Sequence, residues 1–133
     1  DVLLTETDIR CKVNYPDAIV TTTWGIDLHY PDKQNSRYFP GQEFIAYAIH
    51  PNKRKEDYTF PYRCLYSRNI ENLFMAGRNI SVTHIALGAI RVQRTTGMMG
   101  EVVGMAAYLC MKYRCSPRQL YTDYLQELLD CVS

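Results

Sequence analysis

The pattern of apolar and polar positions divides this chain into predicted strands in its first half and predicted helices in its last quarter. Residues 18–24 are dense in β-branched side chains, which favour a strand over a helix. Residues 43–49 and 58–66 predict two further strands, and Pro61 places the latter at a sheet edge or a bulge. Residues 73–76 are wholly apolar, which is typical of a short strand buried on both faces.

Helical spacing with start signals predicts the other elements. A capping-box-like pattern at residues 5–8 predicts a short helix over residues 6–13. Residues 98–112 carry apolar side chains on a helix that opens with hydroxyl groups. Residues 116–119 form a second capping box with proline at the first helical position, and leucines and tyrosines follow at helical spacing. Residues 30–41 are rich in turn-forming residues and are expected to be loop.

These elements predict an α+β fold with a small mixed or antiparallel sheet and two packed C-terminal helices. One domain is expected from 133 residues. Within it, residues 1–66 would form a sheet portion, residues 67–115 a strand and a glycine-rich helix, and residues 116–133 an amphipathic helix.

Composition and charge exclude several classes of partner. The net charge of +1 provides no strong field for nucleic acid, and no stretch approaches the length of about 18 apolar residues that spans a bilayer. The cysteines match no zinc spacing, so no metal is predicted, and we interpret them as free thiols. Free thiols favour a reducing compartment such as the cytoplasm over the periplasm. The cysteines are Cys11, Cys64, Cys110, Cys115 and Cys131.

Glycines inside the predicted long helix point to something packed against it. Gly100 and Gly104 each cost about 1 kcal/mol relative to alanine in a helix interior. Either another backbone or a ligand packed on that face would offset this cost, and both alternatives stand. The start of the helix, near Thr95 and Thr96, offers unpaired N–H groups and a partial positive charge to an electron-rich ligand.

A second candidate ligand wall lies just upstream. The apolar residues 73–76 end in Ala76-Gly77, where a backbone without a Cβ atom can approach a ligand closely. A polar loop with His84 and Arg91 is expected to follow. The order of these features carries more information than any one of them.

In that order, residues 69–107 resemble the C-terminal flavin-binding segment of the FAD-dependent oxidoreductases, relatives of the succinate dehydrogenase and fumarate reductase flavoproteins. Residues 24–29, Trp-Gly-Ile-Asp-Leu-His, and 61–65, Pro-Tyr-Arg-Cys-Leu, are similar to this family as well. The resemblance implies that residues 73–77 are the last strand of the FAD-binding sheet. It also implies that the glycine-rich helix points at the flavin ring and that residues 1–66 lie on the substrate side.

Candidate site residues follow from the resemblance and from the residue types. His84 and Arg91 are the catalytic candidates, with a structural histidine and a paired arginine as the alternatives. Asp27 and His29 would lie on one face of an extended segment and contact substrate, or serve a turn or edge; Arg63 is a third substrate candidate. The predicted flavin contacts are Ala76, Gly77, Arg78, Ser81, Thr95, Thr96, Gly97 and Met98.

Two departures from the family limit these expectations. The dinucleotide fingerprint G-x-G-x-x-G is missing from the 133 residues. The relatives also often carry an acid at the position of Arg78, where it holds the ribityl chain; Arg78 would instead face phosphate or form an ion pair.

The resulting hypothesis is the C-terminal part of an FAD-dependent oxidoreductase, inactive alone, that works with the rest of its parent flavoprotein on a small molecule of unknown identity. A binding or oligomerisation module that self-associates through its exposed apolar strand is an alternative. Another is a polysaccharide-processing protein, because some relatives are labelled as polysaccharide or xanthan lyases.

Overall fold

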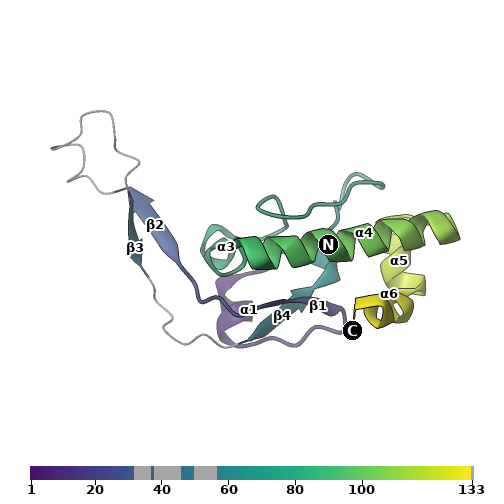
Figure 1. The fold of residues 1–133 in the computed structure, drawn as a ribbon, viewed down its shortest axis with the longest axis horizontal. Helices are drawn as coiled ribbons and strands as arrows, with labels where there is room; N and C mark the ends of the chain where they lie inside the picture. Colours follow the sequence, from purple (N-terminus) through teal and green to yellow (C-terminus); the bar gives the residue numbers. More distant parts are fainter. Residues whose placement is uncertain (32–36, 38–45, 50–56, 133) are drawn as a thin grey trace.

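The computed structural model describes residues 1–31, 37, 46–49 and 57–132, and these form an α+β fold (Figure 1). The predicted fold class is confirmed. The elements in chain order are α1 (Glu6–Arg10), β1 (Ala18–Thr22), β2 (Leu28–Pro31), β3 (Ala46–Ile49), β4 (Tyr58–Pro61), the 3-10 turn η1 (Tyr62–Cys64), α3 (His84–Ile90), α4 (Gln93–Tyr113), α5 (Pro117–Asp123) and α6 (Leu125–Val132).

The described strands form two antiparallel pairs. In the first, β1 pairs with β4 so that Val20 faces Phe60, and the register shifts just before Val20, as at a bulge. β4 is shorter than predicted because the chain turns into η1 directly after Pro61. In the second pair, β2 lies beside β3 and extends away from the helices in Figure 1.

The β2–β3 pair changes the predicted start of the loop over residues 30–41 and does not test the predicted start of the strand over residues 43–49. Tyr30 and Pro31 belong to β2 and pair with β3, although the sequence predicts loop there. Proline is compatible with this place because it ends a strand that pairs on one side among the described residues. The rest of the predicted loop, apart from residue 37, and residues 43–45 of the predicted strand lie outside the described residues.

The long helix α4 packs across the β1–β4 pair and closes the main core. Its buried face carries Met99, Val102, Ala106 and Leu109, which recur every three or four residues as helical geometry requires. Val20 of β1 and other fully buried side chains complete this core. Burial of each such large apolar side chain contributes about 1.5–3 kcal/mol. No helix in the described part of the chain is long and apolar enough to cross a membrane.

The C-terminal region confirms its predicted start but contains two helices rather than one. The Ser116 hydroxyl accepts the Gln119 N–H at 3.3 Å, and the Gln119 side chain accepts the Ser116 N–H at 2.8 Å. The helix then breaks at Tyr124, whose φ is −135°. The Tyr124 ring stacks on Tyr113 at the end of α4 with a centroid distance of 3.9 Å. We attribute the break to this contact, which holds the chain against α4 before α6 begins.

The first helix, α1, also begins with the capping box that the sequence predicts. Thr5 and Asp8 form the predicted capping box, with the Thr5 N–H donating to the Asp8 carboxylate at 2.7 Å. The helix ends at Arg10 rather than at residue 13, because Lys12 adopts a left-handed backbone with a φ of 50°.

Residues 73–76 are not the doubly buried strand that their apolar character predicts. Phe74 makes one isolated bridge to Tyr66, and the Leu73 side chain stays 40% exposed. Within the described residues this segment has a hydrogen-bonded neighbour on one side only, at residues 65–67. A strand buried on both faces needs partners that the described residues do not provide.

The expected polar loop around His84 is a helix instead. Thr83 caps α3 by accepting the Ala86 N–H at 3.4 Å, and Ala86, Ala89 and Ile90 are buried. Their helical spacing overrides the turn-forming tendency of Gly88, because burial of this face stabilises α3.

Candidate functional site

A polar cavity of about 200 Å³ lies where the start of β2 meets α3 and the turn after Gly77. Its polar lining comes from three separate parts of the chain. The sequence prediction assigned two of these residues to substrate, one to the cofactor and two to catalysis. They are Asp27, His29, Arg78, His84 and Arg91.

Asp27 organises one side of this cavity. Its Oδ2 atom accepts a hydrogen bond from Arg91 Nη2 at 3.2 Å and lies 3.1 Å from His29 Nε2. The Asp27 side chain is only 11% exposed, so its charge is partly removed from water. A carboxylate oxygen accepts hydrogen bonds, so in the neutral tautomer that suits this contact the imidazole donates from Nε2 and carries its lone pair on Nδ1.

Close backbone packing fixes the wall of the cavity beside Asp27. A Cβ atom placed on Gly88 would lie 2.5 Å from the Asp27 carbonyl oxygen. Any larger residue would therefore push α3 away from the segment that carries Asp27 and His29. The glycine within the apolar run of residues 84–90 was the sequence signal for this contact, but it supported a loop equally well.

Arg78 and His84 are placed differently from Arg91. Both line the cavity, and both are exposed residues. Neither side chain forms an ion pair or a hydrogen bond with the residues that the structure describes. Of the cavity's two guanidinium groups, the Arg91 charge is therefore balanced by Asp27, whereas the Arg78 charge is not.

The predicted flavin contacts around the Ala-Gly turn are accessible. Gly77 has a φ of 104°, a left-handed conformation that favours glycine, and its N–H donates to Met99 Sδ at 3.2 Å. Ala76 is exposed. Ser81 holds the segment to the core, because its N–H donates to the Cys64 carbonyl at 3.0 Å. The segment around this turn is thus held to the core by hydrogen bonds, while Ala76 stays exposed to solvent.

The threonines at the start of α4 do not cap it as predicted. The helix begins at Gln93 after Val92, so Thr95 and Thr96 lie inside its first turn. Thr95 is buried and donates to the Thr22 hydroxyl at 3.3 Å, whereas Thr96 donates to the Gln93 carbonyl at 3.0 Å. The hydroxyls are used within the fold, because the helix starts two residues earlier than the hydroxyl pattern indicates.

The glycines of α4 form an open surface. No atom lies within 4 Å of a Cβ placed on Gly97, Gly100 or Gly104. All three face solvent, opposite the side of α4 that covers β1, while the neighbouring Met98 is partly buried against the core. The described residues therefore provide no close backbone neighbour that would offset the cost of these glycines.

Arg63, the remaining substrate candidate, lies outside the cavity. Its guanidinium forms a forked ion pair with the fully buried Asp17, with Nη2 and Nε at 2.8 and 2.9 Å from the two carboxylate oxygens. This hydrogen bonding raises the pKa of Arg63. Its guanidinium also lies over the Tyr121 ring, 4.8 Å from its centroid. Asp17 follows Pro16 in a turn, and no local pattern in the sequence indicates this pairing.

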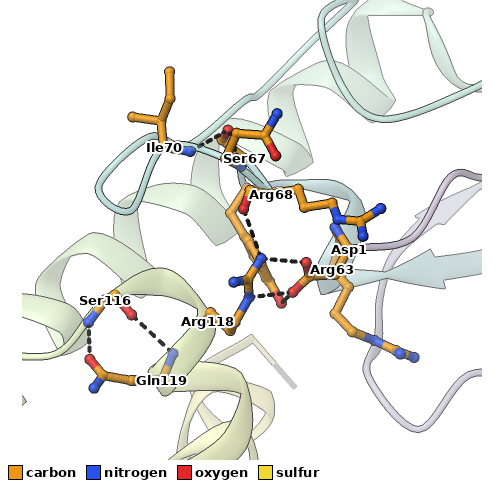
Figure 2. Close-up of polar contacts among 10 residues, drawn as sticks. Asp1, Arg63, Ser67, Arg68, Ile70, Ser116, Arg118 and Gln119 are labelled. Atoms are coloured by element: carbon orange, nitrogen blue, oxygen red, sulfur yellow. Dashed lines mark hydrogen bonds and ion pairs between the residues drawn. The ribbon is translucent and has the colours of Figure 1, made fainter.

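A second cavity of about 210 Å³ lies near the start of α5, and several of its polar groups are bound within the fold. Arg118 donates to the Asp1 carboxylate, with Nε at 2.7 Å from Oδ2, and to the Arg68 carbonyl at 3.0 Å (Figure 2). Ser116 and Gln119 are occupied by the capping box, which the same view shows. The second cavity gathers none of the residues that the sequence predicts for the site.

Metal binding has no visible basis in the described part of the chain, where no three His, Cys, Asp or Glu side chains are grouped. All of the cysteines are free thiols. Burial raises the pKa of the Cys64 thiol to about 12, so this buried thiol stays protonated near neutral pH.

Comparisons with known proteins agree with the resemblance at the level of the family. The family model described as FAD dependent oxidoreductase matches residues 1–129. No curated protein and no solved structure matches the chain.

Proposed function

We propose, on the premise that this chain belongs to the FAD dependent oxidoreductase family, that it forms the C-terminal part of a longer flavoprotein. In that protein it would supply one wall of the flavin pocket and part of the substrate site. Within the family we place it beside the succinate dehydrogenase and fumarate reductase flavoproteins, on the motif of residues 69–107. The observation that carries the proposal is the cavity where the predicted substrate and catalytic residues meet.

The surface next to this cavity fits a flat ring system. The exposed faces of Gly97, Gly100 and Gly104 present no Cβ atoms, and the turn at Ala76 and Gly77 offers accessible backbone. These residues would hold the flavin ring. The dinucleotide fingerprint that grips the phosphates is not among the 133 residues, so the grip would come from another part of the parent protein.

The cavity itself fits a small substrate rather than the ring. Its volume of about 200 Å³ is below the roughly 300–1,000 Å³ that is typical of pockets for drug-sized ligands. When bound, FAD supplies hydride or electron transfer. The residues of this chain would bind the substrate, orient it and exchange a proton with it.

Proton exchange is best assigned to His29. The imidazole donates from Nε2 to Asp27, which leaves the Nδ1 lone pair available to take a proton from a substrate. Arg91 holds the Asp27 carboxylate and therefore acts as a positioning residue. His84 lines the same cavity and is proposed as a direct substrate contact.

Flavin binding tests this proposal. We expect the parent protein to be yellow as purified, and the 133-residue chain alone to bind FAD more weakly than micromolar, as measured by a flavin fluorescence titration. A parent protein that stays colourless after incubation with FAD would overturn the proposal. Micromolar or tighter binding by the chain alone would refute the dependence on another part of the protein.

Self-association is a second candidate function, because apolar groups are exposed beside the open glycines. Met111 of α4 is 78% exposed, and Tyr108 and Leu73 are exposed as well. Such a surface tends to be covered by a partner, and a second copy of the chain could cover it. Light scattering that shows a monomer across a wide concentration range would exclude this candidate. The described residues offer no feature that favours polysaccharide processing.

A further inference from the structure

We propose that Cys110 and Cys115 form a redox-active dithiol at the end of α4, which a small-molecule disulfide such as glutathione disulfide oxidises to an intramolecular disulfide bond. The two cysteines lie where α4 turns into α5, whereas the cavity between β2 and α3 lies toward the other end of α4 (Figure 1). This site does not depend on the proposed flavin function, and the chain alone is sufficient to test it.

The turn that ends α4 places the two cysteines next to each other. Arg114 adopts the left-handed backbone conformation with a φ of 51°, and its N–H donates to the Met111 carbonyl at 3.4 Å. The Cys115 N–H donates to the Cys110 carbonyl at 3.0 Å. These two hydrogen bonds form the Schellman motif, in which the side chains at the positions of Cys110 and Cys115 often make an apolar contact. In this turn both positions carry a thiol.

The two thiols interact with each other. Both side chains are partly buried against the core. Burial, followed by the neighbouring Cys115 thiol and its hydrogen bond, raises the pKa of Cys110 to about 12. A disulfide joins residues whose Cα atoms lie roughly 4.4–6.8 Å apart. Two residues that share a backbone hydrogen bond and have interacting thiols can meet this requirement with little movement of the chain.

The surrounding structure holds both members of the pair in place. Cys110 lies in the last turns of α4, and Cys115 directly precedes Ser116, the N-cap of α5. The buried Tyr62 lies near both thiols, and its hydroxyl donates to the Pro117 carbonyl at 3.1 Å. Because the folded state already positions the two thiols, the folded chain should form the disulfide more readily than the unfolded chain.

The exchange with glutathione disulfide takes place in two balanced steps. Burial keeps the Cys110 thiol protonated near neutral pH, so we assign the first attack to Cys115. Its sulfur loses a proton and attacks one sulfur of the oxidant, which forms a mixed disulfide and releases one glutathione thiolate. The Cys110 sulfur then loses its proton, attacks the Cys115 sulfur and displaces the second glutathione thiolate. The cysteines lose two electrons, and the two released protons convert the thiolates to two glutathione thiols.

The test is oxidation of the folded chain in glutathione buffers of fixed redox ratio, followed by alkylation of the remaining thiols and tryptic peptide mapping. Trypsin cleaves after Lys112 and Arg114, so residues 95–112 and 115–118 leave as separate peptides unless the disulfide joins them. We expect the joined peptides, with an equilibrium constant for their formation at least about tenfold higher in the folded chain than in urea. Separate peptides, or an equal constant in both states, would overturn the proposal.

Two matched variants test whether this pair is responsible. The oxidised chain should unfold at a higher urea concentration than the reduced chain, because the disulfide restricts the unfolded state. Cys115→Ser should abolish both the joined peptides and this difference. Cys131→Ser removes an exposed thiol of α6 and should retain both. A difference that persists in Cys115→Ser, or disappears in Cys131→Ser, would contradict the proposed site.

Discussion

Two aspartate–arginine pairs in this molecule share their chemistry but differ in their surroundings. Asp17 is fully buried and accepts three hydrogen bonds from Arg63, one from its backbone and two from its guanidinium. The Asp27 side chain is 11% exposed and borders a cavity, and Arg91 Nη2 donates to its Oδ2 atom at 3.2 Å and to its backbone carbonyl at 3.5 Å. The first pair is closed by its own contacts, and the second is open to a ligand.

The comparison shows why an ion pair alone does not identify a functional site. At the closed pair, both carboxylate oxygens of the aspartate are used inside the fold, and two tyrosine rings lie beside the Arg63 guanidinium. At the open pair, the same type of contact holds a carboxylate beside an imidazole and leaves a second arginine, Arg78, to bind something else. The closed pair therefore has no carboxylate oxygen left for a ligand, whereas the open pair borders the cavity to which we assign the proposed function.

The largest expected effect comes from breaking the closed pair. Asp17→Asn leaves the Arg63 charge without its buried partner, and removal of one member of such a pair typically costs about 3–5 kcal/mol. Asp27→Asn should cost clearly less, because water and the cavity can solvate Arg91. Urea unfolding of both variants measures this difference, and equal losses would contradict the distinction between closed and open pairs.

Two glycine substitutions should have effects of opposite sign. Gly88→Ala places a Cβ 2.5 Å from the Asp27 carbonyl, and relief of that overlap should cost about 1–3 kcal/mol. Gly100→Ala meets no atom within 4 Å and should stabilise the chain by about 0.5–1 kcal/mol. Thermal unfolding of the two variants checks both signs.

The Gly100→Ala variant also tests whether the exposed glycine face of α4, formed by Gly97, Gly100 and Gly104, contacts the flavin. In the parent flavoprotein, Gly100→Ala should weaken FAD binding if the ring covers α4, even though it stabilises the chain alone. Unchanged FAD affinity would place the flavin elsewhere.

Alkaline pH should weaken the closed region. Burial raises the pKa of Cys64 from 9.0 to about 12, with the Asp17 charge contributing. The folded state therefore keeps this proton to higher pH than the unfolded chain, so the related stability is complete below pH 9.0 and is lost as the pH rises toward 12. From Cys64 alone, the free energy of unfolding should fall by about 1.4 kcal/mol between pH 8 and pH 10.

Cys64→Ala provides the control for this prediction. The variant is less stable at all pH values because the substitution leaves a small cavity. Its free energy of unfolding should nevertheless fall less between pH 8 and pH 10 than that of the unsubstituted chain. Burial also raises the pKa values of Tyr58 and Tyr62 above the ordinary value of 10.0, so these begin to add to the loss near pH 10, equally with and without Cys64. An identical pH dependence of the unfolding free energy in the variant and in the unsubstituted chain would contradict the role of Cys64.

Small effects are also expected at the helix caps. Thr83→Ala and Ser116→Ala each remove one hydroxyl acceptor, from α3 and α5 respectively, and should each cost about 1 kcal/mol. Only Thr83→Ala should also change the amide NMR signals of the residues that line the first cavity, because α3 carries the cavity residue His84. NMR spectra of the ¹⁵N-labelled variants separate the two, and unchanged cavity signals in Thr83→Ala would show that the start of α3 does not shape the cavity.

The sequence predicted the starts of helices correctly where the stabilising contact joins residues that are close in the chain. Both capping boxes, at Thr5 and at Ser116, are present because their partners lie three residues away. The strand at β1 follows from its β-branched residues. By contrast, the break at Tyr124 depends on a ring contact with Tyr113 across two helices, and no local pattern reports such a contact.

The sequence identified the residues that line the first cavity, but it did not predict how they are arranged. Asp27, His29, Arg78, His84 and Arg91 were all named from motifs and residue types, and the structure gathers them around one cavity. The sequence could not separate them from Arg63, because an arginine that folds back on a distant Asp17 has no local signature. Tertiary contacts decide between the two roles.

The most direct test of the account is the absorption spectrum of the purified parent protein after incubation with FAD. We predict the absorption bands of a bound flavin, and weaker retention of FAD in Gly100→Ala, whose added Cβ would lie on the open face of α4. A parent protein that stays colourless would contradict the account.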